Sequence, residues 1–348
     1  LALALAGCSD APLREWRTTE KGGVFSLSIS LDAEHVLVGA VQHGGSLWRT
    51  ADGARLYDWN HKPDQVSALV ATAFSAEGRF AATAERHQLA LWDVASGRAI
   101  ATWAMEAPVL SIAVSGNGQR LLVGLQDNSA LLIDTARDEP LARIRHGNGV
   151  QAVAITADGR IGITGADDGM LRAWDLDTGS TLLAHKFASG ISTLALSADG
   201  SLLFVSNLAS RRIYRYRLAD GALLDSFPHG AAAEPWAAEA RPFGLKVWRG
   251  RLYQGLVHSA MESQDRSLLE ARVYASALDG SDLRLVNRFP LNYERGLGFY
   301  IRSGARDFEI PADWRPWKDG YNTSGPDRDG LRFLDNAFPQ PLLADIEV

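Results

Sequence analysis

Apolar and polar positions alternate along much of this chain, and the alternation returns at a fixed interval. The segments VLSIAVSGNG (109–118), VQAVAITADG (150–159) and ISTLALSADG (191–200) start 41 residues apart. Each alternates over six residues and ends on Asn-Gly or Asp-Gly, which predicts a strand followed by a tight turn. A second apolar strand follows each turn, and residues 24–40 and 66–84 show the same order in a looser form.

A third predicted strand in each unit ends on a bulky anchor residue. These anchors lie 44, 41, 41 and 42 residues apart: Trp48, Trp92, Ile133, Trp174 and Tyr216. A fourth strand follows each anchor. Four short strands in a unit of about 40–45 residues are typical of a β-propeller blade.

The stretch GADDGMLRAWD (165–175) carries the Trp-Asp pair of a WD repeat, and residues 24–228 resemble WD-repeat proteins. The first blades also resemble those of bacterial lipoproteins built from WD repeats. This resemblance implies an all-β fold, a WD40-like propeller of four-stranded antiparallel blades. Five blades fall in 24–228, and about seven are expected in all, within a range of six to eight, the last one allowed to be incomplete. It also implies that an N-terminal strand, here Glu15–Thr19, closes the ring. Many family members share a buried network of His, Ser/Thr, Trp and Asp side chains, and we expect only fragments of it in this chain.

Beyond residue 228 the 41-residue rhythm stops. Residues 229–348 are expected to form irregular blades with long loops in the same propeller. Strands predicted in 242–260 and 271–289, on either side of a loop, favour a sixth blade with an insertion. The end of the chain, 339–348, fits either the first strand of another blade or the completion of a smaller ring. This part faintly resembles propeller regions of large bacterial surface proteins.

The chain uses cysteine once, at Cys8, behind the apolar run LALALAG. Residues 1–8 read as the remnant of a signal peptide with a lipobox, in which the cysteine receives lipid, and 9–23 as a tether. A buried apolar N-terminus with an incidental cysteine is the alternative. We therefore expect a lipid-anchored protein on the periplasmic face of the bacterial cell envelope. Ser9 after the cysteine favours the outer membrane, whereas Asp10 leaves the inner membrane open.

Composition and charge narrow the function classes. The 46% hydrophobic and 22% charged residues are those of a globular protein. A net charge of −6 argues against a nucleic-acid partner, because binding to phosphates needs a basic surface. A single cysteine excludes an intrachain disulfide and a cysteine-rich zinc site.

No catalytic template appears in the sequence. The eight histidines are scattered without a zinc-binding spacing, and Walker, dinucleotide and Gly-x-Ser-x-Gly motifs are missing. The segment PDRDG (326–330) has calcium-loop spacing but too few ligands, so a turn is favoured. Asp167 and Asp168 are interpreted as turn residues. We therefore predict no catalytic residue, no metal and no cofactor.

Trp314 and Trp317, with Arg315 between them, form the candidate interface, because tryptophan and arginine are common interface anchors. They would equally suit stacking on a sugar or capping the propeller core. The sequence favours a non-catalytic scaffold that binds an unidentified envelope protein. The alternatives are a propeller enzyme of the lactonase, quinoprotein or glycosidase kind, and a carbohydrate or cell-surface binder.

Overall fold

The computed structural model describes residues 24–40, 44–61, 68–137, 139–191, 193–291, 299–303, 306–310 and Pro316. The predicted lipobox, the tether with its ring-closing strand, and the segments 326–330 and 339–348 lie outside the described residues.

The described chain folds into six four-stranded antiparallel sheets, which we call blades 1 to 6 in chain order. Blades 1 to 3 consist of β1 (Val24–Ile29), β2 (His35–Ala40), β3 (Gly44–Arg49), β4 (Arg55–Trp59); β5 (Leu69–Phe74), β6 (Phe80–Glu85), β7 (Gln88–Asp93), β8 (Ala99–Ala104); and β9 (Val109–Val114), β10 (Arg120–Leu125), β11 (Ser129–Asp134), β12 (Ala142–Arg145). Blades 4 to 6 consist of β13 (Val150–Ile155), β14 (Ile161–Ala166), β15 (Met170–Asp175), β16 (Thr181–Lys186); β17 (Leu194–Leu196), β18 (Leu202–Asn207), β19 (Arg212–Arg217), β20 (Ala222–Pro228); and β21 (Ala240–Trp248), β22 (Arg251–His258), β23 (Glu270–Ala277), β24 (Arg284–Pro290). Two 3₁₀ turns, η1 (Ala237–Glu239) and η2 (Arg266–Leu268), and a hairpin of β25 (Phe299–Ser303) and β26 (Arg306–Ile310) complete the described elements.

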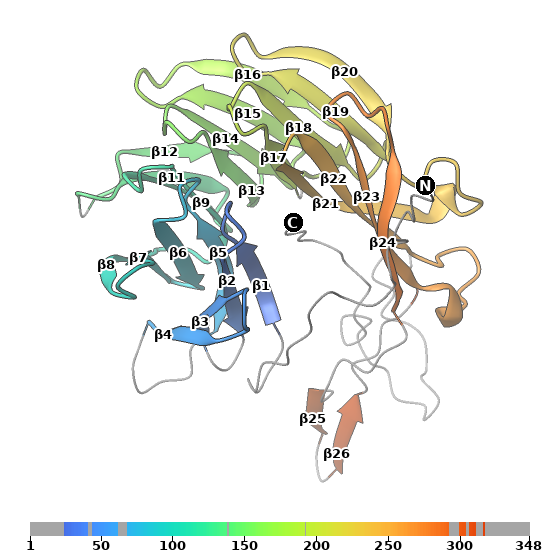
Figure 1. Cartoon of the computed structure of the whole chain (residues 1–348), viewed down its shortest axis with the longest axis horizontal. Coiled ribbons are helices and arrows are strands. Elements are labelled where there is room, and N and C mark those ends of the chain that lie inside the picture. The colour runs from blue at the N-terminus through green and yellow to red at the C-terminus, as the bar shows by residue number, and fades with distance from the viewer. Residues whose placement is uncertain are drawn as a thin grey trace, which may run out of the picture.

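The blades follow one another in an arc, from β1–β4 in blue to β21–β24 in orange (Figure 1). The first strand of each blade packs against the first strand of the next, from β1 through β5, β9, β13 and β17 to β21. Each sheet keeps the chain order of its four strands. This is the radial architecture of a β-propeller, so the predicted all-β propeller of four-stranded antiparallel blades is confirmed.

The favoured count of about seven blades is wrong for the described residues, which hold six; six lies within the predicted range of six to eight. The sixth blade uses more chain than the others, because its strands are longer and residues 259–269 separate β22 from β23. After blade 6, the described residues add the β25–β26 hairpin rather than another four-stranded sheet.

The hydrophobic core lies between consecutive blades. Leu89 and Leu91 of blade 2 share a buried cluster with Leu121 and Val123 of blade 3. Such contacts bury one face of each sheet against its neighbour, which supplies most of the driving force for assembly. Within the described residues, no helix is long and apolar enough to cross a membrane.

The predicted anchors occupy equivalent places. Trp48, Trp92, Ile133 and Tyr216 are all buried. In blade 6 the equivalent position is Ser276, because Ser276 pairs with the second residue of β22 as Trp174 pairs with the second residue of β14. The bulky anchor is missing there, and residues 229–239 and 259–269 lengthen the unit, so the sequence rhythm stops at this blade.

Blade 4 carries a buried polar chain from its third strand to the loop before its first. Trp174 Nε1 donates to Thr164 Oγ1 at 3.4 Å, and Thr164 Oγ1 lies 2.8 Å from His146 Nε2. His146 Nδ1 faces Asp168 Oδ1 at 4.0 Å. Since the tryptophan N–H occupies the threonine oxygen as donor, the threonine hydroxyl can donate to a neutral imidazole. Burial, together with the charge of Arg172, lowers the pKa of His146 to about 4 and outweighs the opposing effect of Asp168.

Blade 4 therefore holds all four side chains of the network, with hydrogen bonds joining Trp174, Thr164 and His146 and with Asp168 facing the imidazole at 4.0 Å. The network recurs in part elsewhere. In blade 2, Thr83 Oγ1 accepts from Trp92 Nε1 at 2.8 Å and lies 2.7 Å from His61 Nε2. In blade 6, Gln254 stands where blade 4 has threonine. Its side chain accepts from the Gly230 N–H at 2.8 Å and reaches Ser276 Oγ at 3.4 Å. In blade 6, the longer glutamine amide thus joins the loop before the first strand to the third strand, as the blade 4 network does, but without a tryptophan.

A hydrogen bond links the two ends of the arc. Trp248 Nε1, at the end of β21, donates to the Leu31 carbonyl in the turn between β1 and β2 at 3.4 Å. The turns joining first to second strands and third to fourth strands lie at the same end of each antiparallel sheet. We call this end of the propeller the turn face; in blades 1 and 2 it comprises residues 30–34, 50–54, 75–79 and 94–98.

Candidate functional site

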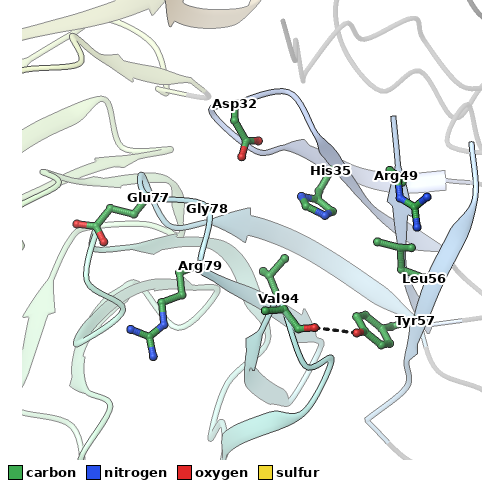
Figure 2. A pocket seen from close by; sticks show the side chains of 10 residues that line it. Asp32, His35, Arg49, Leu56, Tyr57, Glu77, Gly78, Arg79 and Val94 are labelled. Atoms are coloured by element: carbon green, nitrogen blue, oxygen red, sulfur yellow. Dashed lines mark hydrogen bonds between the residues drawn. The ribbon is translucent and has the colours of Figure 1, made fainter. Parts of the chain in front are cut away.

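An open groove of about 510 Å³ lies on the turn face between blades 1 and 2. Its walls come from both blades: Asp32, His35, Arg49, Leu56, Tyr57, Glu77, Gly78, Arg79, Val94 and Ala95. Figure 2 shows the side chains of His35, Leu56 and Val94 directed toward its middle, with Asp32 and Glu77 farther out on the two turns. The volume falls in the range of clefts that hold small ligands.

The floor of the groove is apolar and held in place by the neighbouring blade. Val94 follows β7 and is buried, while Leu56 on β4 is half-buried. Tyr57 donates its hydroxyl to the Ala95 carbonyl at 2.9 Å, the dashed line in Figure 2. A Cβ added at Gly97 would lie 2.4 Å from the Tyr57 ring, so only glycine fits under that ring. These contacts make the floor a rigid part of the blade 1–blade 2 junction.

The groove is open because two bridging residues found between blades 3 and 4 are absent here. There, Arg120 at the start of β10 donates to the Gly159 carbonyl at 2.8 Å and to Asp177 Oδ1 at 2.6 Å, crossing the junction. The pocket that remains at that junction holds about 210 Å³. The equivalent positions at blades 1 and 2 are His35, which is shorter, and Ala95, which has no carboxylate.

The turns that flank the groove follow a pattern shared with other blades. A hydroxyl donates to the carboxylate or amide oxygen two residues later in four blades: Ser30 to Asp32, Ser115 to Asn117, Thr156 to Asp158 and Ser197 to Asp199. Although burial raises the pKa of Asp32, hydrogen bonds from the Ser30 hydroxyl and the Glu34 N–H, with His35 nearby, hold it below its ordinary value. In blade 2 the longer Glu77 takes this position, and its carboxylate is exposed.

Blade 1 differs from the others at the next residue of this turn. Ala33 has φ of 60°, whereas Gly78, Gly118, Gly159 and Gly200 have φ of 69° to 72°. This left-handed conformation suits glycine and costs energy for alanine, because the Cβ approaches the backbone.

Two arginines of the groove are already paired. Arg49 Nη1 donates to Asp52 Oδ2 at 3.0 Å, and Arg79 Nε lies 3.9 Å from Asp93 Oδ2. The carboxylates of Asp32 and Glu77 have no lysine or arginine partner among the described residues. The unpaired charge of the groove is therefore negative.

Asp32, Glu34 and His35 offer three ligand atoms within 4.8 Å of one another. The Asp32 carboxylate is engaged in the turn described above, and the equivalent Asp158 and Asp199 make the same bonds without such neighbours. We therefore assign Asp32 to the turn, and this cluster supports neither a metal site nor catalysis.

The sequence-predicted site residues, Cys8, Trp314, Arg315 and Trp317, lie outside the described residues. The groove residues were not predicted from the sequence. A comparison of equivalent turn positions could have found them, since His35 and Ala95 stand where blades 3 and 4 have Arg120 and Asp177.

Comparisons with known proteins agree with this architecture. The model of the family "WD domain, G-beta repeat" matches residues 139–175. Among solved structures, the fold is similar to the β-propeller domain of Cps50 (Swd1) from Myceliophteria thermophila, with a TM-score of 0.61 and 17% identity, over 80% of this chain and 89% of that one. No curated protein sequence matches the chain. The chain is a β-propeller, and residues 139–175 match the WD-repeat model.

The matched repeat contains all four members of the blade 4 network: His146, Thr164, Asp168 and Trp174. The blade that matches the family model is thus also the one in which all four of these side chains lie along one polar chain. The groove lies between blade 1, which departs from that pattern with Arg49 after Trp48, and blade 2, which keeps the Trp92-Asp93 pair.

Proposed function

We propose that this WD40-like propeller is a non-catalytic scaffold that docks a partner protein in the groove between blades 1 and 2. WD40 propellers generally bind other proteins, and the rigid sheets present loops from several blades on one surface. The observation that carries the proposal is the open groove itself, a concave site with an apolar floor and charged walls at a junction that another blade pair closes with an ion pair.

Site-specific photo-crosslinking in the native cells tests this role. A photoreactive amino acid at the exposed position of Glu77 lies on the groove wall, and one at Asn117 lies at the equivalent exposed turn position of blade 3. We expect a discrete protein adduct from position 77 and a different pattern from position 117. Absence of an adduct at position 77, or identical adducts at both positions, would contradict the proposal.

We further propose that lipid on Cys8 holds the scaffold at the bacterial cell envelope, facing the periplasm, with the outer membrane favoured. The support is the lipobox-like LAGC sequence at residues 5–8. A Cys8→Ser variant is expected to move from the membrane fraction to the soluble periplasmic fraction. Unchanged membrane association of that variant would refute the anchor.

A further inference from the structure

We propose that the segment bound in the groove is basic and apolar, an extended peptide that places a hydrophobic side chain on the floor and arginine or lysine near Glu34 and Glu77. This inference rests on the proposed function, because it specifies the partner of the same groove. Its basis is that two exposed carboxylates on the turns of blades 1 and 2, those of Glu34 and Glu77, form no ion pair with the described residues.

The Glu77 carboxylate accepts no hydrogen bond from the described residues of its own turn. In four other blades the short side chain at this position accepts a hydrogen bond from the hydroxyl two residues earlier. In blade 2 the Ser75 hydroxyl accepts from the Phe80 N–H at 3.1 Å, as the equivalent hydroxyls of those four blades do from the residue five positions on. Among the described residues, however, it forms no hydrogen bond to Glu77. The Glu77 side chain is exposed at the groove wall and, among the described residues, forms no ion pair.

Among the described residues Glu34 forms no ion pair, because blade 1 reverses two charges. Blade 4 has Arg160 at the equivalent turn position, 3.4 Å from Asp175 at the end of its third strand. Blade 1 has Glu34 and Arg49 at these two positions, but Arg49 pairs with Asp52. Glu34 is thus left exposed beside the groove, close to Asp32.

The floor of the groove determines the apolar part of the proposed peptide. Leu56 and Val94 offer apolar surface between the two walls, and Tyr57 is fixed by its bond to the Ala95 carbonyl. An apolar side chain seated there would remove this surface from water. Unpaired carboxylates around such a floor attract a cation and repel an acidic segment, which gives specificity and faster association at low salt.

Fluorescence anisotropy with labelled peptides tests the chemistry directly on the full chain. We expect the peptide RLRLR to bind at least about tenfold more tightly than ELELE and more tightly than RSRSR, which lacks the apolar side chains. Raising the salt from about 50 to 300 mM should weaken RLRLR, because exposed charges are screened. Equal binding of RLRLR and ELELE, or salt-independent binding, would overturn the inference.

A matched pair of variants assigns the effect to the groove. Glu34→Gln combined with Glu77→Gln removes two exposed charges whose side chains form no hydrogen bond or ion pair with other described residues. Glu139→Gln combined with Glu262→Gln removes two exposed charges elsewhere. The groove variant is expected to bind RLRLR about tenfold more weakly and the control variant within about twofold of the original chain. Equal weakening by both variants would contradict binding in the groove.

Mass spectrometry of the position 77 photo-adduct separates the two proposals. A crosslinked segment with basic and apolar residues supports both. An acidic segment overturns this inference and leaves the docking function intact. If no adduct forms, the docking function fails, whatever the peptides do.

Discussion

Acidification is expected to destabilise the propeller through His146. Its imidazole is buried and its pKa is lowered from 6.5 to about 4 in the folded chain. The unfolded chain therefore takes up a proton that the folded chain refuses. The stabilisation is fully present above pH 6.5 and is lost as the pH falls toward 4. With about 1.4 kcal/mol for each pKa unit, His146 alone removes about 2 kcal/mol of the free energy of unfolding between pH 7.5 and 5.

Urea denaturation at pH 7.5, 6 and 5 measures this loss, with a His146→Gln variant as the comparison. Glutamine does not titrate, so the difference in unfolding free energy between the original chain and the variant should shrink by about 2 kcal/mol on going to pH 5. His229 is also buried with a pKa lowered to about 4, through burial and the charge of Arg211. Adding His229→Gln should flatten the profile further. Parallel pH profiles for the original chain and His146→Gln would refute the reasoning.

Three further outcomes follow from the turn and network geometry. Ala33→Gly relieves the left-handed alanine and should raise the free energy of unfolding by about 0.5–1 kcal/mol in urea denaturation; a loss of stability would contradict the strain. Thr83→Val leaves the buried Trp92 indole N–H and a histidine nitrogen without their hydroxyl partner and should cost about 2–4 kcal/mol, whereas a cost below about 0.5 kcal/mol would show that the network contributes little. His35→Arg combined with Ala95→Asp rebuilds the bridge of blades 3 and 4, and anisotropy should show loss of RLRLR binding while either single variant retains it; retained binding in the double variant would contradict the location.

The sequence predicted the first five blades because their signals are local. Alternation over six residues, a tight turn and an anchor such as Trp92 or Trp174 all act within one repeat, so the period could be read directly. Blade 6 was harder to recognise as one repeat, because Ser276 replaces the bulky anchor and Gln254 replaces the threonine of the network. The network in blade 2 was missed since it joins His61 to a strand 22 residues away.

The groove could not be predicted by searching for functional motifs, because it is produced by side chains that are too short. His35 and Ala95 carry no motif, and their meaning appears only when they are set against Arg120 and Asp177 at another junction. Side chains distant in sequence meet at such junctions, so their charge balance depends on the register of two blades. The pairing of Arg49 with Asp52 rather than Glu34 is likewise a matter of geometry.

The contact between Trp248 and the Leu31 carbonyl has a consequence for how the chain folds. Each blade is built from neighbouring hairpins and can form as soon as its own residues are available, but this bond joins residues 217 positions apart. Such a distant pairing must wait until five blades have left the ribosome, and its loop-closure entropy slows it relative to the local hairpins. During synthesis, the face of blade 1 that contacts blade 6 in the folded chain therefore stays exposed the longest. This is the surface on which a chaperone would have to prevent aggregation.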